Sequence, residues 1–184
     1  MKKETEQKSE TPEKTEKRCN RTWEAAGRYQ GAFTVIDPKF ELWPVRYLLD
    51  TNIYIYFFLD REQLSRDVRA ILEDYDNTFC VSSETVRELI VGFNNGGIMS
   101  RFWKTAKEMV DAIREVFFIE ILPVGAEQME TYSKLELNHQ EKHYDPSDHV
   151  IISHSITNGI PLISSDRKFQ FYRKQGLDLI YNVK

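Results

Sequence analysis

The sequence YLLDTNIYIYFF, at residues 47–58, contains the change of pattern that decides the fold. Residues 47–49 form a short apolar run that predicts a buried strand, and Asp50 follows this run directly. The aromatic run at residues 54–58 then predicts a helix that begins at about Asn52. From this point the chain alternates between predicted strands and predicted helices.

The alternation continues to the C-terminus. The further predicted strands are short apolar runs at residues 78–81, 117–122, 161–163 and 177–181. The further predicted helices cover residues 66–75, 83–93, 98–116, 126–140 and 147–156. Ser83 is the expected cap of one of these helices, and Ser147 is expected to open the last one. Strands separated by helices predict an α/β fold in three layers, with a mostly parallel central sheet covered on both faces.

The length and composition indicate one globular domain with an appendage. A chain of 184 residues is too short for two ordinary domains, and its 41% hydrophobic and 12% aromatic content suits a packed core. No apolar run approaches the roughly 20 residues that a membrane helix needs. The lysines near the N-terminus have no apolar stretch behind them, so we expect neither a membrane span nor a secretory signal.

The cysteines bear on the cellular compartment, and the net charge bears on the class of function. Cys19 and Cys80 are the only cysteines and form neither a disulfide framework nor a metal-ligand spacing, which favours a reducing cytoplasm. The formal charge of −4 argues against a generic basic coat for nucleic acid. It does not exclude a nuclease, because carboxylates that hold divalent cations lower the net charge.

Two segments precede the predicted domain, which we place at residues 46–184. Residues 1–21 are rich in lysine and glutamate and almost free of apolar residues, so we expect a disordered charged tail. Residues 22–45 are rich in aromatic residues but too short to form a core. We therefore expect this second segment to dock onto its own domain or onto a partner.

Four acidic residues occur where a parallel sheet would bring them together. Asp50 directly follows the first predicted strand, and Glu88 lies on the second turn of the helix after the second strand. Asp148 lies in the first turn of a predicted helix, and Asp166 follows the strand in PLIS. Because ligands of open α/β sheets bind outside the carboxyl ends of the strands, all four acids can converge on one edge. Oxygen ligands of this kind select Mg²⁺ or Mn²⁺.

Each acid also has a plain structural explanation. Asp148 can be an ordinary helix cap, and Asp166 an ordinary turn residue. Glu88 can be an exposed helix residue, and Glu84, one turn earlier, is a rival for any role given to it. Asp50 is harder to explain in this way, because a charge at the end of an apolar strand is partly buried and needs a partner or a metal.

Four pieces of the sequence support a joint reading of these acids. They are LLDTN at 48–52, SSETVRELIVG at 82–92, DPSDHVIISHSI at 145–156 and PLISSDRKF at 161–169. In this order they resemble the PIN-domain family, especially the VapC-type toxin ribonucleases of type II toxin–antitoxin systems. The resemblance places the glutamate of the second piece at Glu88 rather than Glu84. In the third piece Ser147 and His149 depart from the family pattern.

The resemblance implies a PIN-like α/β/α fold and a metal-dependent endoribonuclease that hydrolyses RNA and leaves a 5′ phosphate. It implies one or two Mg²⁺ or Mn²⁺ ions bound by Asp50, Glu88, Asp148 and Asp166. The groups expected to orient the carboxylates or a water are Thr51, Asn52 and Ser164. The implied partners are an RNA substrate, a cognate antitoxin protein and a second copy of the chain in a homodimer.

Basic residues and histidines near these motifs have less specific signals. The candidates for phosphate contact, each of which can equally be a solvated surface charge, are Arg61, Arg167, Lys168 and Arg173. His143 and His149 flank the loop around the third motif. We interpret both histidines first as surface or capping residues, with catalysis as the alternative.

The segment at residues 22–45 is similar to the toxin-binding tail of antitoxins. If it reaches the acids of its own or a partnering chain, Arg28 would pair with the carboxylates and restrain the nuclease. The plain alternative is that the segment packs on the sheet edge as an N-terminal extension.

Two rival functions come from other classes. The first is a catalytically silent PIN-like module that binds RNA or protein, which the presence of all four acids disfavours. The second is an aspartate-dependent phosphotransferase, which is disfavoured because Asn52 stands where a second aspartate would be needed.

Overall fold

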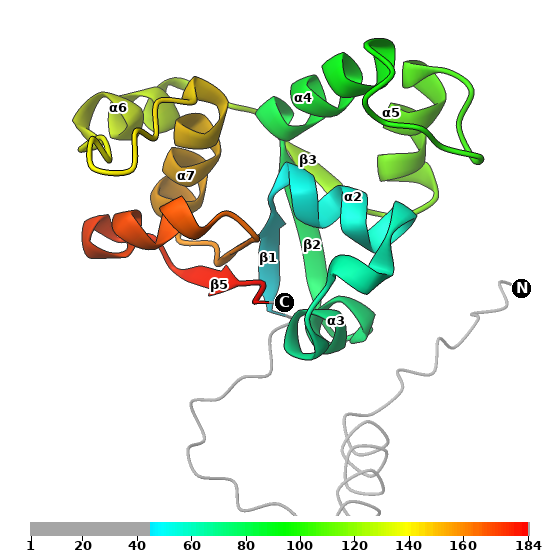
Figure 1. The fold of residues 1–184 in the computed structure, drawn as a ribbon, viewed down its shortest axis with the longest axis horizontal. Helices are drawn as coiled ribbons and strands as arrows, with labels where there is room; N and C mark the ends of the chain where they lie inside the picture. The colour runs from blue at the N-terminus through cyan, green and yellow to red at the C-terminus, as the bar shows by residue number, and fades with distance from the viewer. Residues whose placement is uncertain (1–44, 184) are drawn as a thin grey trace, which may run out of the picture. The chain divides into compact units, whose positions relative to one another are not determined.

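The computed structural model describes residues 45–183, and a five-stranded sheet forms the centre of this part (Figure 1). The strands are β1 (Arg46–Leu49), β2 (Thr78–Ser82), β3 (Glu120–Leu122), β4 (Leu162–Ser164) and β5 (Leu179–Tyr181). Their spatial order is β3-β2-β1-β4-β5, and every neighbouring pair is parallel. The predicted α/β fold is confirmed, and the described sheet is parallel throughout. The predictions for residues 1–21 and 22–44, including Arg28, lie outside the described residues.

The central strand β1 and its neighbour β4 are buried on both faces, which explains their nearly continuous apolar sequences. Leu48 pairs in register with Cys80 and Leu162 and packs in one core cluster. Its neighbour Leu49 pairs with Ile163 and packs in the other cluster. Because successive strand residues point to opposite faces, this alternation requires a layer of helices on each side of the sheet.

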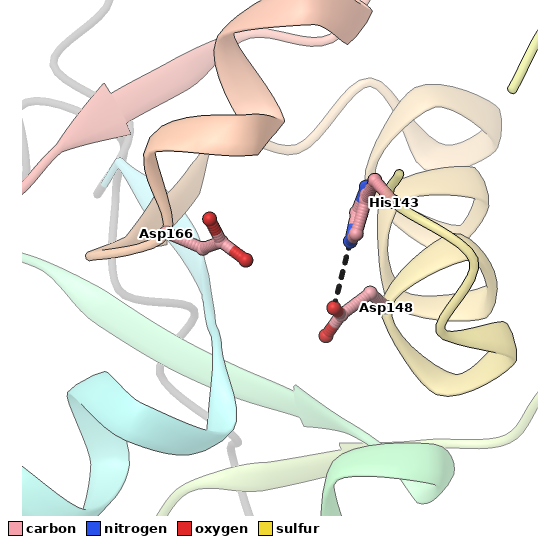
Figure 2. Close-up of side chains that lie close together, drawn as sticks. All are labelled: His143, Asp148 and Asp166. Atoms are coloured by element: carbon pink, nitrogen blue, oxygen red, sulfur yellow. Dashed lines mark hydrogen bonds and ion pairs between the residues drawn. The ribbon is translucent and has the colours of Figure 1, made fainter. Parts of the chain in front are cut away.

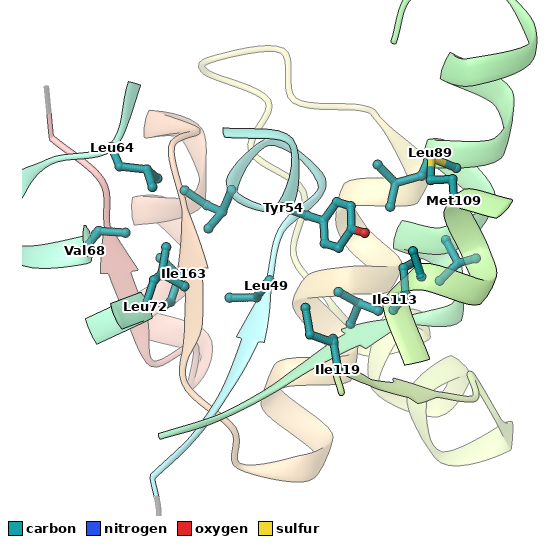
Figure 3. Close-up of a cluster of buried hydrophobic side chains, with 14 of the residues drawn as sticks. Leu49, Tyr54, Leu64, Val68, Leu72, Leu89, Met109, Ile113, Ile119 and Ile163 are labelled. Carbon is teal, nitrogen blue, oxygen red and sulfur yellow. The ribbon is translucent and has the colours of Figure 1, made fainter. Parts of the chain in front are cut away.

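The first layer contains the helices that follow β1 and β2. These helices are α2 (Thr51–Leu59), α3 (Arg66–Glu73), α4 (Ser83–Asn94) and α5 (Ala106–Glu115). Figure 3 shows how their apolar side chains meet those of Leu49 and Ile163, with Tyr54 of α2 at the centre of the cluster. A single 3-10 turn, η2 (Arg61–Gln63), separates α2 from α3.

The second layer contains the C-terminal helices. They are α6 (Ala126–Lys134), α7 (Pro146–Asn158) and the 3-10 helix η3 (Arg167–Gln175). Ile151 and Ile152 of α7 pack with Phe169 and Tyr172 of η3 on the face that carries Leu48, while α6 packs on α7. Within residues 45–183, no helix is long and apolar enough to span a bilayer.

Two predicted helices were too long. The helix expected at 98–116 begins only at Ala106, because the hydroxyl of Thr105 accepts the backbone N–H of Glu108 and caps the helix there. The helix expected at 126–140 ends at Lys134, and the chain then turns. In this turn the side-chain oxygen of Asn138 accepts the backbone N–H of Glu141, a local bond that competes with helical pairing.

Two predicted helix starts were displaced. The cap of α4 is Ser82 rather than Ser83, since the Ser82 hydroxyl accepts the N–H of Glu84. The cap of α7 is Asp145, with proline at the first helical position, so Ser147 lies inside the helix instead of opening it. A proline lacks the N–H that the first turn leaves unpaired, which favours this start.

The strand order places a topological switch beside β1. The chain runs outward from β1 through β2 to β3 and then returns to β4 on the other side of β1. In open α/β sheets, ligands usually bind at such a switch, in the crevice outside the carboxyl ends of the strands. Asp50 follows β1 and Asp166 follows β4, so both lie at this crevice.

Candidate metal centre

Asp50 lies at the carboxyl end of the central strand and has only 3% of its surface exposed. Its Oδ1 accepts the backbone N–H of Thr51 at 2.7 Å, and its Oδ2 accepts the hydroxyl of Ser164 at 2.7 Å. Burial raises the pKa of Asp50 to about 7; the charges of Asp148 and Glu88 act in the same direction, and the two hydrogen bonds act against it. A nearby cation would remove much of the cost of ionising this carboxyl.

Glu88 approaches the same region from α4. Its Oε2 accepts the hydroxyl hydrogen of Thr51, which fixes the orientation of the carboxylate. Burial raises the pKa of Glu88, and Asp148 and Asp145 act in the same direction, whereas the bond from Thr51 lowers it. Thr51 therefore touches two acids, giving its backbone N–H to Asp50 and its hydroxyl to Glu88.

Glu84, the sequence rival of Glu88, is engaged elsewhere. Its carboxylate pairs with Arg87 at 2.6 Å, and the same guanidinium donates to the hydroxyl of Ser147 at 2.6 Å. The hydrogen bond from Arg87 lowers the pKa of Glu84. The structure thus separates the two glutamates, since Glu84 already has a cationic partner.

Asp148 lies on α7, which precedes β4 in the chain, and Asp166 lies just after β4. Asp148 lies in the first turn of α7, where the helix N-terminus favours a negative charge. Asp166 caps η3, with its Oδ1 accepting the N–H of Lys168 at 2.8 Å. The N–H of Asp166 donates to Ser164 Oγ at 3.0 Å, so Ser164 links this residue to Asp50.

Two groups of three side chains offer ligand atoms within 4.8 Å of one another. The groups are Glu88, Asp145 and Asp148, and His143, Asp148 and Asp166. Asp148 belongs to both, while Asp50 belongs to neither but interacts with Asp148 and Glu88 through its charge. Among residues 45–183, no lysine or arginine forms an ion pair with Asp50, Glu88 or Asp166. A concentration of carboxylates in which Arg87, paired with Glu84, is the neighbouring cationic side chain fits the binding of a divalent cation.

The structure corrects the interpretation of the two histidines as surface or capping residues. His143 and His149 are each only 1% exposed. The Nε2 of His143 lies 2.8 Å from Asp148 Oδ2, and its Nδ1 lies 3.0 Å from the hydroxyl of Tyr172. That hydroxyl also lies 2.9 Å from the Nε2 of His149, and burial lowers the pKa of His149. A buried chain of polar groups therefore starts at Asp148 (Figure 2 shows its first link).

The other residues that the sequence suggested for the site make contacts of their own. Asn52 is exposed, and the part of the chain that the structure describes supplies no hydrogen bond to its side chain. Arg61 donates to the backbone of α2, and Arg173 donates to the backbone of β5. Arg167 and Lys168 directly follow Asp166 at the start of η3, and Arg167 pairs with the carboxylate of Glu141 at 2.8 Å.

Two residues at this site, Asp145 and Arg87, were not among the candidates named from the sequence, and a third, His143, was named first as a surface or capping residue. Asp145 had a readable signal, because an aspartate before proline and a predicted helix is a typical N-cap. Arg87 is one turn after Glu84, which predicts the ion pair between them but not its position beside the acids. The sequence around His143 did not indicate its burial, since that burial depends on packing against Tyr172 and Phe169 of η3.

Comparison with known proteins identifies the family. A PIN-domain family model matches residues 47–175, which includes all four of the sequence pieces quoted above and all four acids. The chain belongs to the PIN-domain family. Three solved structures share the fold of this PIN domain. VapBC2 from Rickettsia felis, bound to a DNA fragment from its promoter, has 23% identity and a TM-score of 0.56 over 76% of this chain and 100% of that chain.

The other two structures give similar values. DNA-bound VapBC from Salmonella typhimurium has 19% identity and a TM-score of 0.55, and it covers 74% of this chain and 98% of that chain. VapBC-1 from nontypeable Haemophilus influenzae has 23% identity and a TM-score of 0.54, with the same coverage of 74% and 98%. At these identities the likeness shows the PIN fold alone. The sequence has no significant match among curated proteins.

Proposed function

We propose that this PIN domain is a divalent-metal-dependent endoribonuclease and the toxin of a toxin–antitoxin pair. The observation that carries the proposal is the pair of ligand groups that share Asp148 at the carboxyl edge of the sheet. Their negative charge has no cationic side chain to balance it within residues 45–183, apart from the rim contact made by Arg87. The proposed metal is Mg²⁺ or Mn²⁺, since most of the donor atoms are carboxylate oxygens.

The proposed ligands are Asp50, Glu88, Asp148 and Asp166. Divalent cations held there would bridge a scissile phosphate, activate a water and stabilise the leaving oxygen. The chemical change is attack of water on phosphorus with rupture of the P–O3′ bond, which leaves a 5′ phosphate and a 3′ hydroxyl.

The chain's own residues prepare this step by fixing the carboxylates. Thr51 and Ser164 hold the two oxygens of Asp50, and Thr51 also orients Glu88. Because these carboxylates are already oriented, cation binding costs little rearrangement of the protein. Asn52, exposed beside them at the start of α2, is proposed to orient a water.

The proposed contacts to the RNA backbone are four basic side chains. Arg167 and Lys168 follow Asp166 directly, so phosphates on either side of the scissile bond can reach them. Arg61 and Arg173 are proposed for more distant phosphates, because their local bonds leave them partly exposed. The cluster itself repels an RNA strand until cations neutralise it.

The proposed partners are an antitoxin protein and a second copy of the chain, acting in the cytoplasm. The fold likeness to VapBC structures with TM-scores above 0.5 supports the toxin–antitoxin assignment. The alternative function is a catalytically silent PIN module that binds RNA or a protein. The filled acidic positions disfavour that alternative.

A cleavage assay tests the proposal. Purified full-length protein is incubated with end-labelled single-stranded and stem-loop RNA in Mg²⁺, in Mn²⁺ and in excess EDTA. We expect internal cleavage only with a divalent cation, with products that carry 5′ phosphates. Cleavage that persists in EDTA or leaves 2′,3′-cyclic phosphates would refute metal-dependent hydrolysis, and binding without cleavage under every condition would favour the silent module.

A further inference from the structure

We propose that His143 supplies an imidazole nitrogen ligand to a divalent cation that is also held by Asp148 and Asp166. This inference rests on the proposed function only in assuming that the cluster binds divalent cations. The two ligand groups share Asp148 and no other residue. The first is made of carboxylates alone, whereas the second combines two carboxylates with the Nε2 of His143.

The three side chains of the second group come from separate parts of the chain. Figure 2 shows His143 on the loop before α7, Asp148 on the first turn of α7 and Asp166 after β4, all directed toward a common space. His143 is only 1% exposed, so the protein interior holds its ring in place. A buried imidazole at the edge of an acidic cluster differs from a surface group of carboxylates, because contacts inside the protein already hold it beside the acids.

Contacts on the far side fix the His143 ring. Its Nδ1 lies 3.0 Å from the hydroxyl of Tyr172, which is fully buried. The ring of Phe169 packs at a centroid distance of 5.6 Å. These contacts leave Nε2 as the nitrogen that faces the acids. Histidines that bind metals almost always give their other nitrogen to such a partner, which sets the tautomer and the ring orientation.

The Tyr172 hydroxyl connects His143 to a second buried ring. It lies 3.0 Å from Nδ1 of His143 and 2.9 Å from Nε2 of His149. On its other side, the His143 ring places Nε2 2.8 Å from Asp148 Oδ2. An imidazole nitrogen and a carboxylate oxygen in this position are both donor atoms for a divalent cation.

The different donors of the two ligand groups favour different cations. A site of carboxylates alone suits Mg²⁺, which prefers hard oxygen ligands. Imidazole favours first-row transition metals, and Mn²⁺ accepts both nitrogen and carboxylate ligands. We therefore expect Mn²⁺ to occupy the site of His143, Asp148 and Asp166 at lower concentration than Mg²⁺ does.

Pulsed electron paramagnetic resonance of Mn²⁺ bound to the full-length protein tests this inference without any cleavage assay. Coordination by His143 should produce ¹⁴N modulation of the spin echo, and labelling the histidines with ¹⁵N should replace that pattern in the unmutated protein. His143→Gln should remove the modulation and weaken Mn²⁺ binding at one site by roughly 10- to 100-fold, measured by calorimetry. The matched control is His139→Gln, because His139 is exposed and contacts only Tyr144 through its side chain.

The outcomes separate this inference from the proposed function. Wild-type protein that binds Mn²⁺ without nitrogen modulation, or a modulation that persists in His143→Gln, overturns the His143 ligand even if the protein cleaves RNA. Nitrogen modulation that disappears only in His143→Gln supports the ligand even if no RNA is cleaved. Since the ¹⁵N comparison uses unmutated protein, misfolding of a variant does not prevent the test.

Discussion

Replacing Asp50 with asparagine should stabilise the metal-free protein at pH 8 and not at pH 4. Asp50 is 3% exposed, and its pKa is raised from 3.8 to about 7. Between these two values the folded protein holds a proton that the unfolded chain has released. The free energy of unfolding therefore falls as the pH rises through this window and is level above it.

The size of the effect follows from the same pKa values. A difference of this size corresponds to about 4 kcal/mol, all of it lost by pH 8 in the wild type. Asparagine carries no charge and escapes this loss. However, asparagine has one acceptor oxygen instead of two, so it loses one of the two hydrogen bonds from Thr51 and Ser164. This loss lowers the free energy of unfolding by about 1 kcal/mol. The expected net stabilisation at pH 8 is roughly 2–3 kcal/mol.

Urea denaturation in EDTA, followed by circular dichroism at both pH values, measures the difference. The control is Asp76→Asn, an exposed residue at which we expect a change within about 0.5 kcal/mol at either pH. The reasoning fails if Asp50→Asn destabilises the protein at pH 8. It also fails if the difference between variant and wild type does not depend on pH.

Further predictions concern the N-terminal segment, the serine beside Asp50 and one helix end. Deleting residues 1–44 should raise the rate of RNA cleavage if the segment restrains the nuclease, and unchanged rates with unchanged stability would dismiss that role. Ser164→Ala should lower the free energy of unfolding by roughly 1–3 kcal/mol, because it leaves polar groups unpaired, and it should raise the pKa of Asp50 further, as NMR titration would detect. Gly159→Ala should cost about 1 kcal/mol in thermal or urea unfolding, because Gly159 ends α7 with a φ of +62°, whereas an unaltered stability would exclude strain there.

Much of the fold could be predicted because each strand is an apolar run between turn signals. Leu48 and Leu49 of β1, like Leu162 and Ile163 of β4, are fully buried and point to opposite faces, and burial on both faces requires helices on both sides. Helix lengths were less predictable. Residues 98–105 carry apolar side chains that suggest a helix, yet Trp103 is buried by the tertiary core and the cap at Thr105 sets the start of α5.

The candidate site also has some residues that the sequence could predict and others that it could not. Asp50 and Asp166 directly follow strands, so topology alone brings them to one edge. Glu88 was distinguished from Glu84 by the family pattern, and the structure adds a physical difference, the ion pair of Glu84 with Arg87. The buried position of His143 beside Asp148 could not be predicted, because it depends on contacts with η3, which lies more than twenty residues later in the chain.

The paired variants Glu88→Gln and Glu84→Gln test the central claim most directly. Both remove one negative charge from α4, but only Glu88 belongs to a ligand group, whereas Glu84 pairs with Arg87. The measurement is Mn²⁺ affinity by calorimetry together with the rate of RNA cleavage under saturating Mg²⁺. We predict that Glu88→Gln abolishes cleavage and weakens Mn²⁺ binding, and that Glu84→Gln leaves both close to the wild-type values. Equal losses in the two variants, or wild-type cleavage by Glu88→Gln, would contradict a metal-dependent nuclease built on these acids.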